Sequence, residues 1–167
     1  MRGVGGDYFE RARAISIALL VLAGALAIAG SFMDWTTKGT VPKELRLQSG
    51  FPVIQDLLSD PVTGFDAGDG KVVIAAAVFV LVAAMLLAVT RQGRYGLLAV
   101  LASVVTGAVA IAAYRSLGDT TSDFFRKLDL AGEIDPGIGL ILVAIAGLLG
   151  VLAGSLGMIS SPRDPAP

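Results

Sequence analysis

Carboxylates are the side chains of this sequence that could perform acid and base chemistry, and the candidates lie in two polar segments of the chain. The sequence has no histidine and no cysteine, so the commonest general base, thiol chemistry and the usual ligands of transition metals are missing. The candidate acids are Asp34, Glu44, Asp56, Asp60, Asp66, Asp69, Asp119, Asp123, Asp129, Glu133 and Asp135. Nothing in their spacing selects a pair, and we expect them to keep these segments soluble. An enzyme that acts through two of them is the open alternative.

Motifs for metals, nucleotides and nucleic acids are also missing from the sequence. No phosphate-binding loop, nucleophilic serine turn, zinc motif or dinucleotide fingerprint occurs. Segment 66–70, DAGDG, resembles a calcium loop but lacks the alternating oxygen ligands and final glutamate of an EF-hand. The 13 basic residues are too scattered to bind nucleic acid. We therefore predict no catalytic residue, no cofactor and no metal site, with calcium at 66–70 as the alternative.

The composition indicates an integral membrane protein. Hydrophobic residues make up 54% and charged residues 16% of the 167, with a mean hydropathy of +0.76, whereas soluble domains carry about 25% charged residues. Stretches 14–33, 72–90, 97–114 and 137–159 contain no charged residue. Each is long enough to cross a hydrocarbon core of about 30 Å as a helix. We predict an all-α fold, an integral membrane four-helix bundle that forms a single domain over residues 1–167.

The predicted spans form two transmembrane hairpins. Outer loops 34–71 and 115–136 close the hairpins, and the turn 91–96 joins them. Basic residues favour the cytoplasmic side because they resist translocation. Six of them occupy the 27 positions of the N-terminal segment, the turn and the C-terminal tail, against seven in the 60 positions of the two loops. We therefore expect a cell membrane protein with both termini in the cytoplasm. A cleaved signal peptide is an alternative for the first span, because Ala27-Ile28-Ala29 is an A-x-A site.

Short amphipathic helices are predicted within the two outer loops. The first is predicted at residues 52–58, which begin with a proline. The second is predicted at residues 121–128, with Thr121 or Ser122 as the cap. Their apolar sides pack on the bundle or receive an external partner. Asp69 is the candidate N-cap of the second span, because a short acidic side chain can accept from free backbone N–H groups.

A short internal similarity precedes the second and fourth spans. Segments 66–70 (DAGDG) and 135–139 (DPGIG) have an Asp and two glycines in register. The second hairpin is therefore either a parallel duplicate of the first or similar to it by chance.

Small residues predict where the spans pack most closely. Ala146, Gly150 and Gly154 recur every four positions in the fourth span, and Ser103 with Gly107 forms a second small pair in the third. Such residues let the backbones of membrane helices approach each other. The partner face belongs either to another span of this chain, which we favour, or to another protein.

Five residues near the ends of the spans are predicted to anchor the protein at the membrane surface. They are Trp35, Arg91, Arg94, Tyr95 and Tyr114. Tryptophan and tyrosine favour the depth of the lipid headgroups, and arginines in a short turn favour the cytoplasm.

The runs 30–35 (GSFMDW) and 64–70 (GFDAGDG) make the chain resemble small four-span membrane proteins of high-GC actinobacteria of the mycobacterial type. This resemblance implies the four-span layout and no catalytic residue. Transporters and pumps usually keep ionisable groups at membrane depth, and these spans have none. We expect a structural or accessory protein, a scaffold or subunit of a larger envelope or respiratory assembly, and not an enzyme. The alternative is a carrier or sensor of an apolar ligand such as a lipid. Expected partners are membrane lipid and another membrane protein or a second copy, but not nucleic acid.

Overall fold

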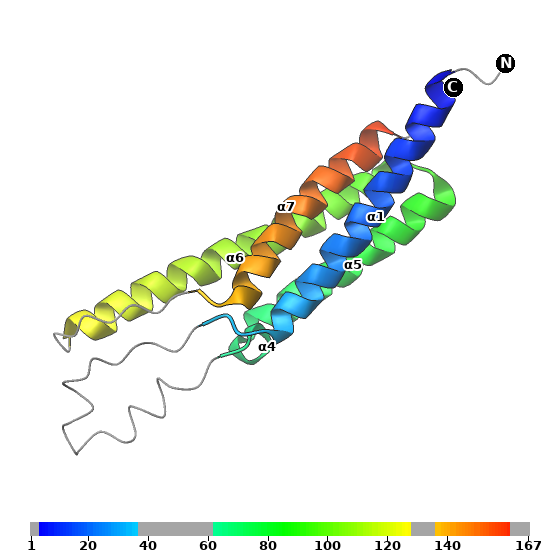
Figure 1. Ribbon diagram of the computed structural model, residues 1–167. Helices are drawn as coiled ribbons and strands as arrows, with labels where there is room; N and C mark the ends of the chain where they lie inside the picture. Colours follow the sequence, from blue (N-terminus) through cyan, green and yellow to red (C-terminus); the bar gives the residue numbers. More distant parts are fainter. Residues whose placement is uncertain (1–3, 37–61, 128–135, 161–167) are drawn as a thin grey trace.

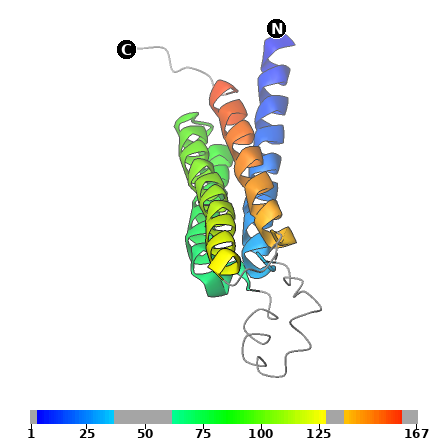
Figure 2. The same cartoon turned by 90° about the vertical axis from the view of Figure 1, so that its left-hand side faces the viewer.

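Four long helices form the described part of the protein. The computed structural model describes residues 4–36, 62–127 and 136–160. Helices α1 (Val4–Phe32), α5 (Asp69–Thr90), α6 (Arg94–Lys127) and α7 (Ile138–Ile159) pack side by side, and a short helix α4 (Gly64–Ala67) precedes α5 (Figure 1). The main contacts join α1 to α5, α5 to α6, α6 to α7 and α7 to α1. The helices therefore follow one another around the bundle in chain order, as in an up-and-down four-helix bundle (Figure 2).

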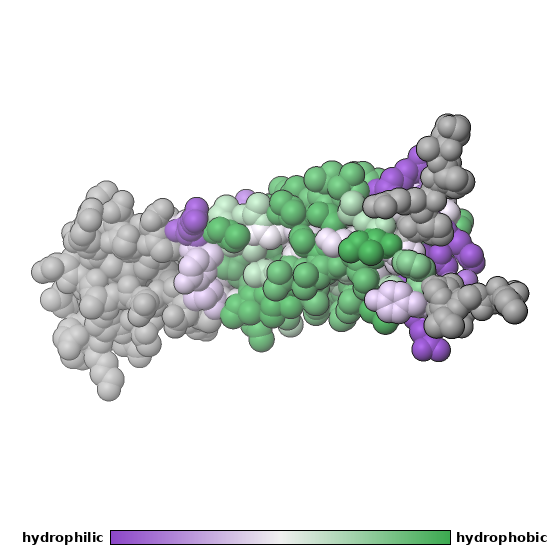
Figure 3. Space-filling model, turned by 90° about the horizontal axis from the view of Figure 1, so that it is seen from above, coloured by the Kyte–Doolittle hydropathy of each residue, from purple (hydrophilic) through white to green (hydrophobic). Residues whose placement is uncertain are grey.

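Each long helix contains a segment that can cross a membrane. The candidate spans are Tyr8–Phe32, Asp69–Thr90, Arg94–Ser116 and Ile138–Ile159, of 22 to 25 residues each. On the face shown in Figure 3, hydrophobic side chains cover the middle of the molecule, and hydrophilic ones lie toward its two ends. The prediction of four apolar helices packed as a bundle is confirmed, and the chain is a multi-pass membrane protein.

Most buried side chains of the bundle are small, although Leu20 and Leu87 are also fully buried, and many large side chains face outward. The buried residues of α7 recur at helical spacing and include five glycines, while Leu148 and Leu152 of the same helix are exposed. On α5, six alanines and valines are buried, whereas Phe79 and Met85 are each 69% exposed. Moving an apolar side chain from lipid into the interior of the bundle gains little free energy, because lipid tails are also apolar. Membrane helices therefore associate through close contacts between their backbones. The distribution of residue sizes around each helix therefore selects the inner face.

Helix α6 is longer than the sequence predicts. It continues as one helix through Lys127, so residues 121–127 are part of α6 and do not form a separate amphipathic helix. The predicted caps Thr121 and Ser122 lie inside this helix. No proline interrupts residues 115–127, and a lone glycine costs a helix only about 1 kcal/mol. The predicted helix at 52–58 lies outside the described residues.

The start of α5 also differs from the prediction. Its N-cap is Gly68, and Asp69 is the first helical residue and not the cap. The side-chain cap belongs to α4, where Thr63 Oγ1 accepts from the N–H of Asp66 at 3.2 Å and donates to its carboxylate at 2.7 Å. Gly68 has a φ of 91°, which an L-residue with a side chain rarely adopts. The chain thus turns between α4 and α5 before Asp69 is reached.

The two segments with the short similarity have different conformations. Gly68 lies in open space with positive φ, whereas its counterpart Gly137 is extended, with a φ of −71°. Gly137 packs on the backbone of Asp34, and its N–H donates to the Trp35 carbonyl at 2.8 Å. Glycine therefore serves a turn in one segment and a close approach in the other, which does not support a duplication.

Candidate functional site

The small face of α7 packs against α6 of the same chain. A Cβ placed on Gly147 would lie 2.9 Å from the Gly107 Cα, and one on Gly150 would lie 2.8 Å from the Ser103 Cβ. One turn further along, a Cβ on Gly154 would lie 2.8 Å from the carbonyl oxygen of Gly96. Ordinary contacts of a Cβ begin near 3.4 Å, so these positions have no room for a side chain. Glycine is thus required along this seam.

The same helix packs on α1 along its neighbouring side. Gly30 and Gly139 face each other so closely that a Cβ on either would lie within 2.7 Å of the other's carbonyl oxygen. Near the middle of α1, Ser16 Oγ donates to the Ala153 carbonyl at 2.6 Å, and both residues are fully buried. Of the predicted packing residues, Ala146, Gly150 and Gly154 are buried inside the bundle, with Ser103. Intramolecular packing occupies the face that the sequence left open to a partner.

Ser103 places a buried hydroxyl in this seam without a conventional hydrogen bond. Its side chain is 2% exposed, and its Oγ has no donor or acceptor partner. The Oγ lies close to the position that a Cβ of Gly150 would take, so the α-hydrogen of Gly150 points toward it. A Cα–H group is a weak donor to oxygen at helix interfaces. Thr106, one turn along, instead donates to its own helix at Ala102 O, at 3.1 Å.

Trp35 does not form part of an exposed aromatic belt. Its ring is 3% exposed, and its Nε1 donates to the Gly30 carbonyl at 2.9 Å. A Cβ on Gly64 would lie 2.6 Å from the ring atom Cζ2. The backbone of Trp35 also accepts from Gly137 N–H and donates to the Val62 carbonyl at 2.9 Å. Trp35 therefore joins the end of α1 to the segments before α4 and α7, which is a structural role that the prediction of a surface anchor missed.

The other predicted anchors lie near the ends of the candidate spans. Arg91 is exposed and has a left-handed backbone with a φ of 59°, where α5 ends. Arg94 begins α6, its guanidinium lies 5.0 Å from the centre of the Tyr95 ring, and it donates to the Tyr95 hydroxyl at 3.1 Å. Tyr114 is 60% exposed and lies within α6, near Ser116, where the candidate span of that helix ends. Two arginines are thus brought together by the turn between α5 and α6.

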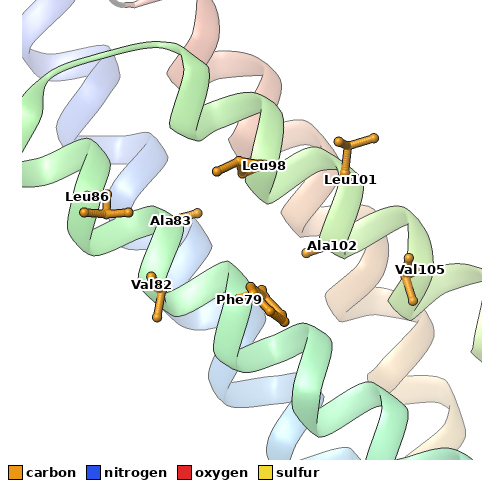
Figure 4. Close-up of a pocket in the computed structure, with 8 residues that line it drawn as sticks. All are labelled: Phe79, Val82, Ala83, Leu86, Leu98, Leu101, Ala102 and Val105. Carbon is orange, nitrogen blue, oxygen red and sulfur yellow. The ribbon is translucent and has the colours of Figure 1, made fainter.

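An apolar groove runs along the outside of the bundle between α5 and α6. Its volume is about 330 Å³, and nearly all of its surface is hydrocarbon (Figure 4). The lining residues are Phe79, Val82, Ala83 and Leu86 of α5 and Leu98, Leu101, Ala102 and Val105 of α6. The two alanines leave room between the larger side chains on either side. Sequence reasoning missed this groove, because it depends on which residues of two helices face each other.

Residues suited to metal binding do not gather anywhere in the described ranges 4–36, 62–127 and 136–160. No three carboxylates lie close enough there to hold an ion together. In segment 66–70, the alternative calcium site, the Asp66 carboxylate accepts from Thr63 Oγ1 at the cap of α4. Asp66 and Asp69 are both exposed.

Comparisons of the chain with protein-family models, with curated proteins and with solved structures find no match. The four candidate spans alone define the class of this protein, which is a multi-pass helical membrane protein. The resemblance to small actinobacterial membrane proteins stays a prediction.

Proposed function

We propose that this protein is a structural or accessory subunit of a larger membrane assembly. The observation that carries this proposal is the backbone-to-backbone packing of α7 on both α1 and α6. Interiors packed in this way resist deformation. The buried polar side chains of the described residues are serines and a threonine, and hydroxyls of this kind are readily satisfied by helix carbonyls. A rigid bundle of this kind suits the support of a partner better than the passage of a polar substrate.

The extension of α6 is the surface that we propose for the partner. The candidate span of α6 ends at Ser116, and the helix continues to Lys127. Eleven further residues add about 16 Å of helix, which projects past the other three helices (Figure 1). Arg91, Arg94, Arg11 and Arg13 lie at the opposite end, and the positive-inside rule favours the cytoplasm for that end. The extension then projects outside the cell membrane.

A purification of the tagged protein from its native membranes in mild detergent tests this function. Mass spectrometry should find a protein partner in stoichiometric amount. Replacing both Phe124 and Phe125 by serine should reduce the retained partner at least tenfold. A matched control replaces the outward-facing Leu148 and Leu152 by alanine and should retain it. Purification of the bundle with no stoichiometric protein partner would contradict the proposal.

A second candidate function is that of a carrier or sensor of an apolar ligand. The groove between α5 and α6 favours it, because the groove is apolar and opens toward lipid. Transfer of a labelled lipid between vesicles, in the presence of the protein, tests this function. A transfer rate equal to that of protein-free vesicles would contradict it.

A further inference from the structure

The groove between α5 and α6 is about 10 Å long and lies within the depth of one membrane leaflet. Its residues run along α5 from Phe79 to Leu86 and along α6 from Leu98 to Val105. From Phe79 to the end of α5 at Thr90 the helix rises about 16 Å. Half of a hydrocarbon core of about 30 Å is about 15 Å. The groove therefore begins near the middle of the membrane and ends one turn before the turn between the helices.

Two exposed arginines stand at the open end of this groove. Arg91 follows α5, and Arg94 begins α6, one turn before Leu98. No carboxylate of the described residues pairs with either guanidinium, and the first turn of α6 contains no acidic residue. Guanidinium groups form paired hydrogen bonds with phosphate oxygens. Positive charge thus lies where the headgroup of a lipid in this leaflet would be.

We propose that the groove and the two arginines form a binding site for one anionic phospholipid. An acyl chain lies in the groove from Leu98 toward Phe79, and the headgroup phosphate binds Arg91 and Arg94. This inference rests on the second candidate function for its ligand class, but it concerns binding and not transfer. If a lipid binds here but is not transferred between vesicles, the carrier function is contradicted and the proposed binding site is not.

The charge at the mouth of the groove favours a phospholipid over a helix of another protein. A transmembrane helix would fill the apolar groove without any need of the arginines, and it favours small residues at its contact. Here the exposed walls are large side chains, including Phe79, Leu98 and Leu101. A single flexible acyl chain can follow such walls, whereas a helix about 10 Å wide needs a broader contact surface.

Native mass spectrometry of the protein in detergent micelles tests the site. The probes are phosphatidylglycerol and phosphatidylcholine with identical dioleoyl chains. We expect the first phosphatidylglycerol to bind at least tenfold more tightly than phosphatidylcholine. Arg91→Gln and Arg94→Gln should each weaken phosphatidylglycerol binding about fivefold, and the double variant about thirtyfold. As the matched control, Arg11→Gln with Arg13→Gln removes the same charge at the same end of the bundle and should change binding less than twofold.

A second pair of variants tests the groove itself. Val105→Trp places a large ring in the groove from its exposed rim, and it should weaken the binding of both lipids at least tenfold. Leu148→Trp makes the same kind of change on the exposed face of α7 and should leave binding unchanged. Intact α-helical circular dichroism shows that each variant is folded. Equal binding of the two lipids by the unmodified protein, or full binding by Val105→Trp, would overturn the proposal. So would a lipid-free dimer that Val105→Trp dissociates, because the groove would then bind a second copy.

Discussion

Replacing Gly150 by alanine adds one methyl group at the tightest point between α6 and α7. The new Cβ would lie 2.8 Å from the Ser103 Cβ and still closer to its Oγ. Rotation of the hydroxyl relieves the contact with the oxygen but not the contact between the two Cβ atoms. The helices must therefore move apart by about 1 Å to reach ordinary contact distances of about 3.5 to 4 Å.

The expected cost follows from two opposing effects. Overpacking of a close-packed interior costs about 1 to 3 kcal/mol, and the better helix propensity of alanine returns about 0.5 to 1 kcal/mol. We expect Gly150→Ala to lower the free energy of unfolding by about 1 to 2 kcal/mol. Titration with sodium dodecyl sulfate in mild detergent micelles, followed by circular dichroism, measures this change. Ser103→Gly removes both clashing atoms, so a double-mutant cycle should give a favourable coupling of about 1 to 2 kcal/mol.

Gly107→Ala is the matched control for this experiment. A Cβ at Gly107 would meet no atom within 4 Å, so the same methyl group should be tolerated or should stabilise the helix by about 0.5 to 1 kcal/mol. Equal stability of Gly150→Ala and Gly107→Ala, or an additive double-mutant cycle, would refute the argument that α6 and α7 touch at this point.

Three further outcomes follow from the packing of α1. Ser16→Ala removes the buried hydrogen bond to Ala153 and should lower the free energy of unfolding in detergent by about 0.5 to 1.5 kcal/mol. An unchanged free energy of unfolding would show that the bond is not formed. Gly64→Ala places a Cβ within the Trp35 ring, so the emission of this single tryptophan should shift to longer wavelength, and an unchanged spectrum would contradict the contact. The mature protein should keep its first span, because α1 supplies buried core residues. An intact mass that corresponds to cleavage after Ala29 would contradict this.

The spans could be predicted because their signal is local. Uncharged stretches of 18 to 23 residues require helices in a membrane, since backbone groups find no water there. The ends were less certain, because charged residues such as Arg115 and Asp119 also fit the exposed continuation of a helix. Helix α6 therefore runs past the predicted end of its span to Lys127.

The role of Trp35 could not be predicted, because it depends on residues far away in the sequence. A tryptophan just after an apolar stretch is typical of the membrane surface, and nothing nearby in the sequence shows that Gly64 and Gly137 pack on it. The groove between α5 and α6 is a similar case. Its two alanines, Ala83 and Ala102, have no special spacing in sequence, and only the pairing of the helices brings them together.

The small residues of α7 illustrate an intermediate case. Their four-residue spacing predicts a close contact, but it does not identify the partner helix. The structure places Gly150 against Ser103 of α6 and within 3.8 Å of the Ala23 Cβ of α1, measured from a Cβ on the glycine. Three helices thus meet at one position, and a sequence pattern in one of them cannot specify the other two.

Disulfide formation between α1 and α7 tests most directly whether the small face of α7 is closed within its own chain. The chain has no cysteine, and a Cβ on Gly157 would lie 3.8 Å from the Ser16 Cβ, which is the mean separation in disulfides, about 3.8 Å. The variant Ser16→Cys with Gly157→Cys should therefore form a disulfide within one chain on mild oxidation of native membranes. Ser16→Cys with the outward-facing Leu148→Cys should not. Disulfides that form only between two chains, or not at all, would show that α7 does not pack on α1 of its own chain in this way.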